Sequence, residues 1–177
     1  MMDDDEIHWF VMRDLTRSNA KRPAYRMLGE MGIEGFTPMT RKIFVCHGRR
    51  ECREVPFIHD LVFVHGSRTV LDPIVARVPT FQYRFLKGRV PMTVRDKEMD
   101  VFRAAVLSDP SPCYYRPEEV TPAMRHHKIR IIGGSLNGCE GSLLTVRGSR
   151  HRRLLVELPM VLAAAVEVEP EYIQLIP

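Results

Sequence analysis

The stretch Lys128–Leu143, KIRIIGGSLNGCEGSL, determines the fold expected for the C-terminal part of the chain. Its first two aliphatic residues alternate with basic ones, which is typical of a strand with one buried face. Gly134 and Gly138 can adopt the positive φ of tight turns, and Gly141 lets a neighbouring strand pack closely. The positions that define this pattern are Ile129, Ile131, Gly134, Gly138, Gly141 and Leu143.

More short runs of strand-forming residues follow, separated by turn signals, at 141–146, 153–158 and 161–168. Short strands at such regular spacing are typical of a small β-barrel. We therefore expect a barrel domain over residues 124–177. The preceding stretch, 108–123, holds four prolines, and proline fixes φ and removes a backbone donor. This composition predicts a linker or rigid strap between two domains.

The first 107 residues alternate between strand and helix patterns. Apolar residues at three- and four-residue steps predict helices over 20–31 and 96–107, and a weaker one over 69–78 because Pro73 interrupts it. The strands are expected at 7–12, 36–46, 55–64, 82–86 and 90–94. Alternation of this kind predicts an α+β domain, with an antiparallel sheet flanked by helices.

Composition and motifs restrict the classes of function that the chain can have. The chain has a net charge of +4 and a pI of about 9.0, a mild excess that suits a nucleic-acid partner. It carries no G-x-S-x-G, P-loop or H-E-x-x-H motif, so we expect no enzyme and no cofactor. The acidic N-terminus and short apolar runs predict a cytoplasmic protein without a membrane segment.

Both halves resemble one family. The segment 129–143 looks like the KOW motif, and Trp9-Phe10-Val11 is similar to the Trp-Tyr-Val strand that opens the NusG N-terminal domain. Pro38 with its basic continuation, and Phe57–Val64, also match positions of that domain. The resemblance covers nearly the whole chain. It implies a NusG-like transcription elongation factor, with an N-terminal NusG-type domain and a C-terminal KOW β-barrel.

A narrower branch is a better match. The stretch Gly32–Met39, the run His59-Asp60-Leu61 and the late segment Val166–Ile173 resemble UpxY-type antiterminators of capsular polysaccharide operons. This resemblance implies an operon-specialised factor that suppresses pausing or termination. The alternative is a KOW-type RNA-binding or ribosome-associated module without polymerase contact.

The family resemblance implies an apolar groove that binds the clamp helices of the largest RNA polymerase subunit. The candidates by position are Trp9, Val11, Ile58, Leu61, Phe63, Tyr83 and Phe85. Because strands alternate their faces, only some of these can line the groove, and the others are expected in the sheet core. The KOW domain's partner is left open among a regulatory protein, a ribosomal protein and a termination factor.

Two basic clusters are candidates for contact with non-template DNA or nascent RNA. The first surrounds the expected hairpin and consists of Arg41, Lys42, Arg49, Arg50 and Arg53. The second, on a barrel turn, consists of Arg147, Arg150, His151, Arg152 and Arg153. Arginine pairs well with phosphate, but a charged turn can equally be a solvated one.

A zinc site is the remaining chemical alternative. Cys46, His47, Cys52 and His59 fall within 14 residues. Structural zinc sites usually pair ligands two to four residues apart, and the two cysteines here are farther apart than that. We therefore expect no metal, and we read the four cysteines of the chain as free thiols.

Overall fold

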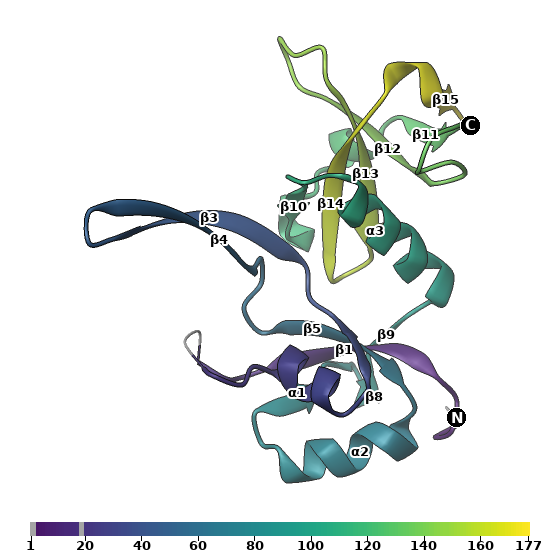
Figure 1. Cartoon of the computed structure of the whole chain (residues 1–177). Helices are drawn as coiled ribbons and strands as arrows, with labels where there is room; N and C mark the ends of the chain where they lie inside the picture. Colours follow the sequence, from purple (N-terminus) through teal and green to yellow (C-terminus); the bar gives the residue numbers. More distant parts are fainter. Residues whose placement is uncertain (1–2, 18–19) are drawn as a thin grey trace. The chain divides into compact units, whose positions relative to one another are not determined.

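The computed structural model describes residues 3–17 and 20–177 and divides into two compact units, Met1–Asp96 and Lys97–Pro177 (Figure 1). The elements of the first unit are β1 (His8–Asp14), α1 (Ala24–Glu30), β2 (Glu34–Phe36), β3 (Met39–Cys46), β4 (Arg49–Pro56), β5 (Leu61–Gly66), α2 (Arg68–Arg77), β6 (Phe81–Tyr83), β7 (Phe85–Leu86), β8 (Val90–Pro91) and β9 (Thr93–Val94). No helix in the described ranges is long and apolar enough to cross a bilayer.

The main sheet of the first unit is antiparallel, with strand order β2-β5-β1-β6 and with β9 also paired to β1. Both helices pack on one of its faces and enclose a continuous core. That core includes Phe10, Met12, Leu28, Val62, Val64, Leu71, Ile74, Phe81 and Tyr83. The predicted α+β arrangement, an antiparallel sheet flanked by helices, is confirmed.

Helix α1 is shorter than the 20–31 periodicity predicted, because Pro23 immediately precedes its first turn. The buried carboxylate of Asp14 accepts a hydrogen bond from the Ala24 backbone N–H at 2.8 Å, so a residue of β1 satisfies the start of the helix. Helix α2 continues through Pro73, whereas the sequence pattern predicts an interruption there. Because proline has no backbone N–H, the helix lacks one intrahelical hydrogen bond at this position. It stays packed on the sheet through Leu71 and Ile74.

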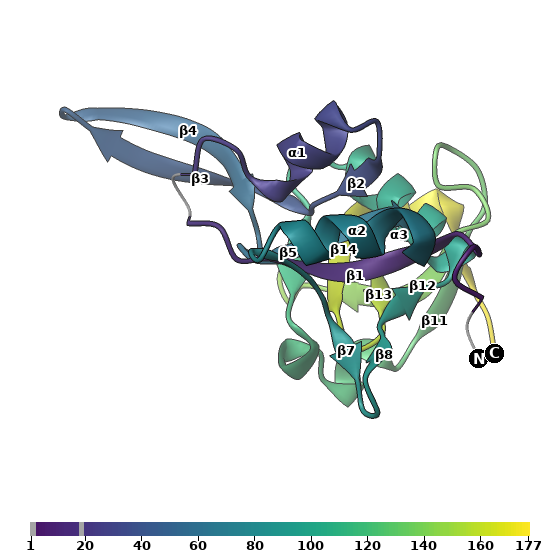
Figure 2. The ribbon, with the colours of Figure 1, turned by 90° about the horizontal axis from the view of Figure 1, so that it is seen from below.

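Two hairpins form separate two-stranded sheets outside the main one. The β3–β4 hairpin is long and extends away from the main sheet of its unit, while β7–β8 is short (Figures 1 and 2). The tip of β3–β4 is the pair His47-Gly48, with φ of 49° and 73°. Both φ values are positive, as two-residue hairpin turns require. Strand β4 therefore begins at Arg49, directly after this turn, whereas the sequence pattern predicted a strand only from residue 55.

The second unit consists of a helix and one antiparallel sheet with strand order β10-β14-β13-β12-β11-β15. Its elements are α3 (Asp96–Ser108), β10 (Cys113–Tyr115), η1 (Pro117–Glu119), η2 (Pro122–Arg125), β11 (Lys128–Ile131), β12 (Glu140–Thr145), β13 (Arg152–Leu158), β14 (Leu162–Val168), η3 (Pro170–Tyr172) and β15 (Ile173–Leu175). The four strands expected after residue 127 are all present, as the KOW-type fold requires.

Two features differ from the expected domain plan. The compact units divide after Asp96, the first residue of α3, whereas the sequence pattern predicts a division at the end of this helix. The helix shares a hollow with the second sheet, since Lys97, Glu98 and Val101 line it together with Val156 of β13. The proline-rich stretch also contributes a sheet strand, because β10 pairs with β14. Its prolines flank β10 and open the two 3₁₀ turns, where no ladder hydrogen bond is needed.

Candidate functional site

Strand register gathers four of the predicted groove residues on one face of the first sheet. Val11 of β1 lies directly opposite Phe63 of β5, and Trp9 opposite His65. Directly opposed residues share a face, and this face is opposite to the one that packs on α1 and α2. We call it the Trp9 face and define it by Trp9, Val11, Leu61 and Phe63. All four side chains are buried, with at most 3% of their surface exposed.

Stacked aromatic rings lie at the edges of this face. The Trp9 indole stacks on the His65 imidazole with ring centroids 4.8 Å apart, and Phe36 of β2 stacks on Phe63 at 6.3 Å. Carboxylate oxygens flank the imidazole: one of Glu34 is 3.3 Å from Nδ1 and one of Asp96 is 3.9 Å from Nε2. His65 and Phe36 were not among the residues that the sequence predicted for this face. The alternation Leu61, Phe63, His65 along β5 was the signal that could have found His65.

The other three predicted groove residues lie elsewhere. Tyr83 belongs to the helix-covered core, because it pairs with Met12 of β1 and packs on Phe10 with ring centroids 5.4 Å apart. Ile58 is half-buried in the turn between β4 and β5, and Phe85 is exposed on β7. The seven candidates therefore do not form one surface, because β6 presents its aromatic ring to the opposite face from Trp9.

The position of Tyr83 has an electrostatic consequence. Its hydroxyl donates a hydrogen bond to the Asp72 carboxylate of α2 at 2.6 Å, and the second oxygen of Asp72 pairs with Arg68 at 3.1 Å. Burial of the phenol raises the pKa of Tyr83 far above its ordinary value, and the hydrogen bond and charge of Asp72 raise it further. Tyr83 thus connects β6 to α2 as a neutral donor.

The first basic cluster divides between two faces of the β3–β4 hairpin. Arg41 and Arg50 lie on the face that carries the exposed side chains of Ile43 and Val45. Lys42, Arg49 and Arg53 lie on the other face. The guanidinium of Arg53 is already bound to Glu51, and it lies over the Phe44 ring at 5.5 Å. The other four cations are exposed, so both faces can meet phosphate.

The second basic cluster occupies the loop between β12 and the start of β13. Arg147 and Arg150 are exposed, whereas His151 contacts Glu167 through Nδ1 at 2.5 Å. Arg153 donates to the Cys113 thiol at 2.6 Å and is part-buried. The cluster therefore offers fewer available cations than its sequence indicates.

The positions of the cysteines disfavour the zinc alternative. Cys46 lies opposite Arg49 and Cys52 opposite Ile43, so the two thiols project from opposite faces of the hairpin. Within residues 3–17 and 20–177, no group of three or more His, Cys, Asp or Glu side chains could hold a metal ion.

The KOW positions take the predicted conformations. Ile129 and Ile131 are buried, and Gly134 and Gly138 have φ of 68° and 85°. A Cβ at Gly141 would overlap the backbone oxygen of Leu155 on β13. The third glycine of the motif is therefore needed for the close approach of two strands.

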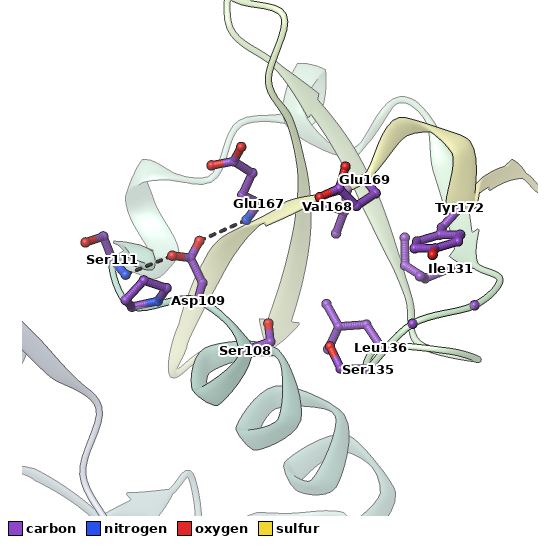
Figure 3. Close-up of a pocket in the computed structure, with 13 residues that line it drawn as sticks. Ser108, Asp109, Ser111, Ile131, Ser135, Leu136, Glu167, Val168, Glu169 and Tyr172 are labelled. Atoms are coloured by element: carbon purple, nitrogen blue, oxygen red, sulfur yellow. Dashed lines mark hydrogen bonds between the residues drawn. The ribbon is translucent and has the colours of Figure 1, made fainter.

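A hollow of about 510 Å³ lies beside these positions in the second unit (Figure 3). Its lining includes the carboxylates of Asp109, Glu167 and Glu169, and no lysine or arginine. Asp109 accepts hydrogen bonds from the backbone N–H groups of Ser111 and Glu167 at 2.8 and 2.9 Å. The hollow is acidic, so phosphate is not a ligand it would favour.

Comparison with known proteins assigns the family. A family model described as transcription termination factor NusG matches residues 7–103, more than half of the chain. No curated protein sequence matches this chain. A solved structure titled "Domain interaction in Thermotoga maritima NusG" is similar, with 14% identity, a TM-score of 0.48, and coverage of 97% of this chain and 98% of that one. From the match of the family model, the chain belongs to the NusG family, whose members are transcription factors that bind RNA polymerase and are not enzymes.

Proposed function

We propose that this protein is an operon-specialised elongation and antitermination factor that binds the clamp helices of the largest RNA polymerase subunit through its Trp9 face. The observation that carries the proposal is the register of β1 and β5, which puts Trp9, Val11, Leu61 and Phe63 on one face, away from α1 and α2. A helix-in-groove contact needs such a group of aromatic and aliphatic anchors.

Because all four side chains are buried, binding there requires that the face first become uncovered. A binding-competent state that is only partly populated lowers the apparent affinity by the same fraction. An operon-specific factor gains from this, since a factor that binds polymerase weakly on its own needs a recruitment signal.

The β3–β4 hairpin supplies the proposed second contact. It extends from the sheet that carries the Trp9 face, and four of its cations are free to meet phosphate. We assign it to the non-template strand of the transcription bubble or to nascent RNA. The two contacts together would hold the protein on elongating polymerase and disfavour paused states, so that a long operon is read through.

The test measures capture of core RNA polymerase and of stalled elongation complexes by the immobilised full-length protein. Val11→Ala is compared with Val62→Ala. Both valines are fully buried on neighbouring strands, but Val11 is on the Trp9 face and Val62 is in the helix-covered core. The two changes remove the same atoms at similar cost to folding, so they differ in the face that they alter.

We expect Val11→Ala to weaken capture about tenfold, from about 1.5 kcal/mol of lost burial, and Val62→Ala to weaken it less than threefold. Read-through of a terminator during transcription in vitro should fall in the same order. Equal losses in the two variants, or no capture by the folded wild type, would reject polymerase binding through this face. In the second case the RNA-binding module becomes the better hypothesis.

A further inference from the structure

One stretch of the first unit contains basic residues and no acidic ones. Residues 73–95 contain Arg77, Arg84, Lys87, Arg89 and Arg95 and no aspartate or glutamate. Their formal charge of +5 exceeds the +4 of the whole chain. The β3–β4 hairpin, by contrast, includes Glu51 and Glu54 among its basic residues. Three of these cations, Arg84, Lys87 and Arg89, lie on or beside the β7–β8 hairpin, where the sequence motifs predicted no nucleic-acid site.

The β7–β8 hairpin concentrates this charge at its tip. Lys87, Gly88 and Arg89 form the turn, with φ of 84° at Gly88 and 57° at Arg89, and Leu86 lies opposite Val90. The side chains of Arg84, Lys87 and Arg89 are exposed, and none has a hydrogen-bond or ion-pair partner among the described residues. Arg53 and Arg68, by contrast, are each paired with a carboxylate.

The same hairpin exposes a ring. The Phe85 side chain is 54% exposed. Its ring contacts that of Tyr83, with centroids 6.0 Å apart, and this contact supports one side of the exposed ring. Leu86 and Val90 are also exposed, at 38% and 46%. A hairpin with two residues in each strand cannot bury these side chains within itself, so core packing does not account for the phenylalanine.

We propose that the β7–β8 hairpin binds single-stranded nucleic acid, with Arg84, Lys87 and Arg89 on the phosphates and Phe85 stacked on a base. Single strands are bound by exposed aromatic rings combined with positive charge, and such stacking tolerates any base. Two short strands give too little area for a protein interface, whereas one ring and three cations match one or two nucleotides. The site is separate from the β3–β4 hairpin and needs no polymerase.

The experiment titrates full-length protein into fluorescein-labelled 12-nucleotide oligomers, oligo(dT) and oligo(U), and follows fluorescence anisotropy at several salt concentrations. The variants are K87Q/R89Q, Phe85→Ala and Phe85→Leu. A charge-matched control, R125Q/R130Q, removes two exposed arginines of the second unit, each paired to a glutamate. All altered residues are exposed, and thermal unfolding checks that each variant folds.

We expect K87Q/R89Q to weaken binding at least tenfold, and to reduce the slope of log affinity against log salt by about 1.4. Phe85→Ala and Phe85→Leu should each weaken it about tenfold with the slope unchanged, because both remove stacking but no charge. Equal affinity for oligo(dT) and oligo(U) indicates a site that contacts only phosphate and base. A higher affinity for one of them indicates whether DNA or RNA is the natural ligand.

Three results overturn the proposal. One is the absence of binding by the wild type at low salt. Another is a loss in R125Q/R130Q as large as in K87Q/R89Q, which indicates attraction by net charge. The third is unchanged affinity in both Phe85 variants, which indicates a general polyanion surface without base stacking.

Discussion

The indole of Trp9 lies nearly parallel to the imidazole of His65, with an angle of 22° between the ring planes. The two residues face each other across β1 and β5, so the stack joins the central strands of the first sheet on the side away from its helices. Aromatic pairs of this kind contribute about 0.5–1.5 kcal/mol beyond their burial.

His65→Ala should therefore lower the free energy of unfolding by about 1 kcal/mol, whereas His65→Phe, which keeps a flat ring beside Trp9, should lower it less. Chemical denaturation followed by circular dichroism measures both. His127→Ala, at an exposed position of the second unit, is the control. Identical stability of His65→Ala and wild type would show that the stack contributes nothing.

The β3–β4 hairpin gives a prediction about two arginines of one strand. Arg50 is free to meet phosphate, whereas Arg53 is bound to Glu51 and lies over Phe44. We expect Arg50→Gln to weaken binding to a transcription-bubble DNA and to lower its salt slope by about 1, with Arg53→Gln changing affinity less than twofold. A larger effect of Arg53→Gln would mean that the Glu51 pair opens on binding.

Gly141 and Gly138 should respond differently to alanine. At Gly141 the added Cβ meets the backbone oxygen of Leu155, which cannot move without displacing β13, so we expect a loss of about 3 kcal/mol or more. At Gly138 the space is open and only the positive φ is strained, so the expected loss is about 1–2 kcal/mol. Thermal and chemical denaturation of the two variants check this order, and a smaller loss at Gly141 contradicts it.

Tyr83 predicts how stability changes at high pH. Burial and the hydrogen bond to Asp72 raise its pKa in the folded state above the ordinary value near 10. The folded state therefore keeps the proton when the unfolded chain has lost it, and stability falls as the pH rises above about 10. The contribution is fully present below that pH.

Tyr83→Phe should accordingly be less stable than the wild type at pH 7, by about 1 kcal/mol for the lost hydrogen bond, and should lose less stability between pH 9 and 11. Denaturation at several pH values measures the difference. Tyr25→Phe, at an exposed tyrosine of α1, should follow the wild-type pH profile. Parallel profiles of Tyr83→Phe and wild type would contradict the assignment.

Local sequence patterns predicted most elements, because alternation and helical periodicity are properties of consecutive residues. The strands after residue 127 and the helix from Asp96 follow the pattern closely. Pro73 within α2 and strand β10 within the proline-rich stretch were not predictable, because tertiary packing holds both.

The candidate site depended on strand register, which sequence alone does not fix. Trp9 and Tyr83 looked alike as strand aromatics, yet pairing with β5 and β6 puts them on opposite faces. The cations of the first hairpin were likewise divided by their pairing. The β7–β8 hairpin had a readable signal, the acid-free stretch 73–95, which a motif search does not register.

Trp9 is the single tryptophan of the chain. Its emission therefore reports on one place in the molecule, one edge of the Trp9 face, where the ring is shielded from solvent and in contact with an imidazole. Uncovering of this face would move the indole from an apolar to an aqueous environment and shift its fluorescence to longer wavelength. The protein thus carries a built-in optical probe, and the opening can be timed without attaching any label.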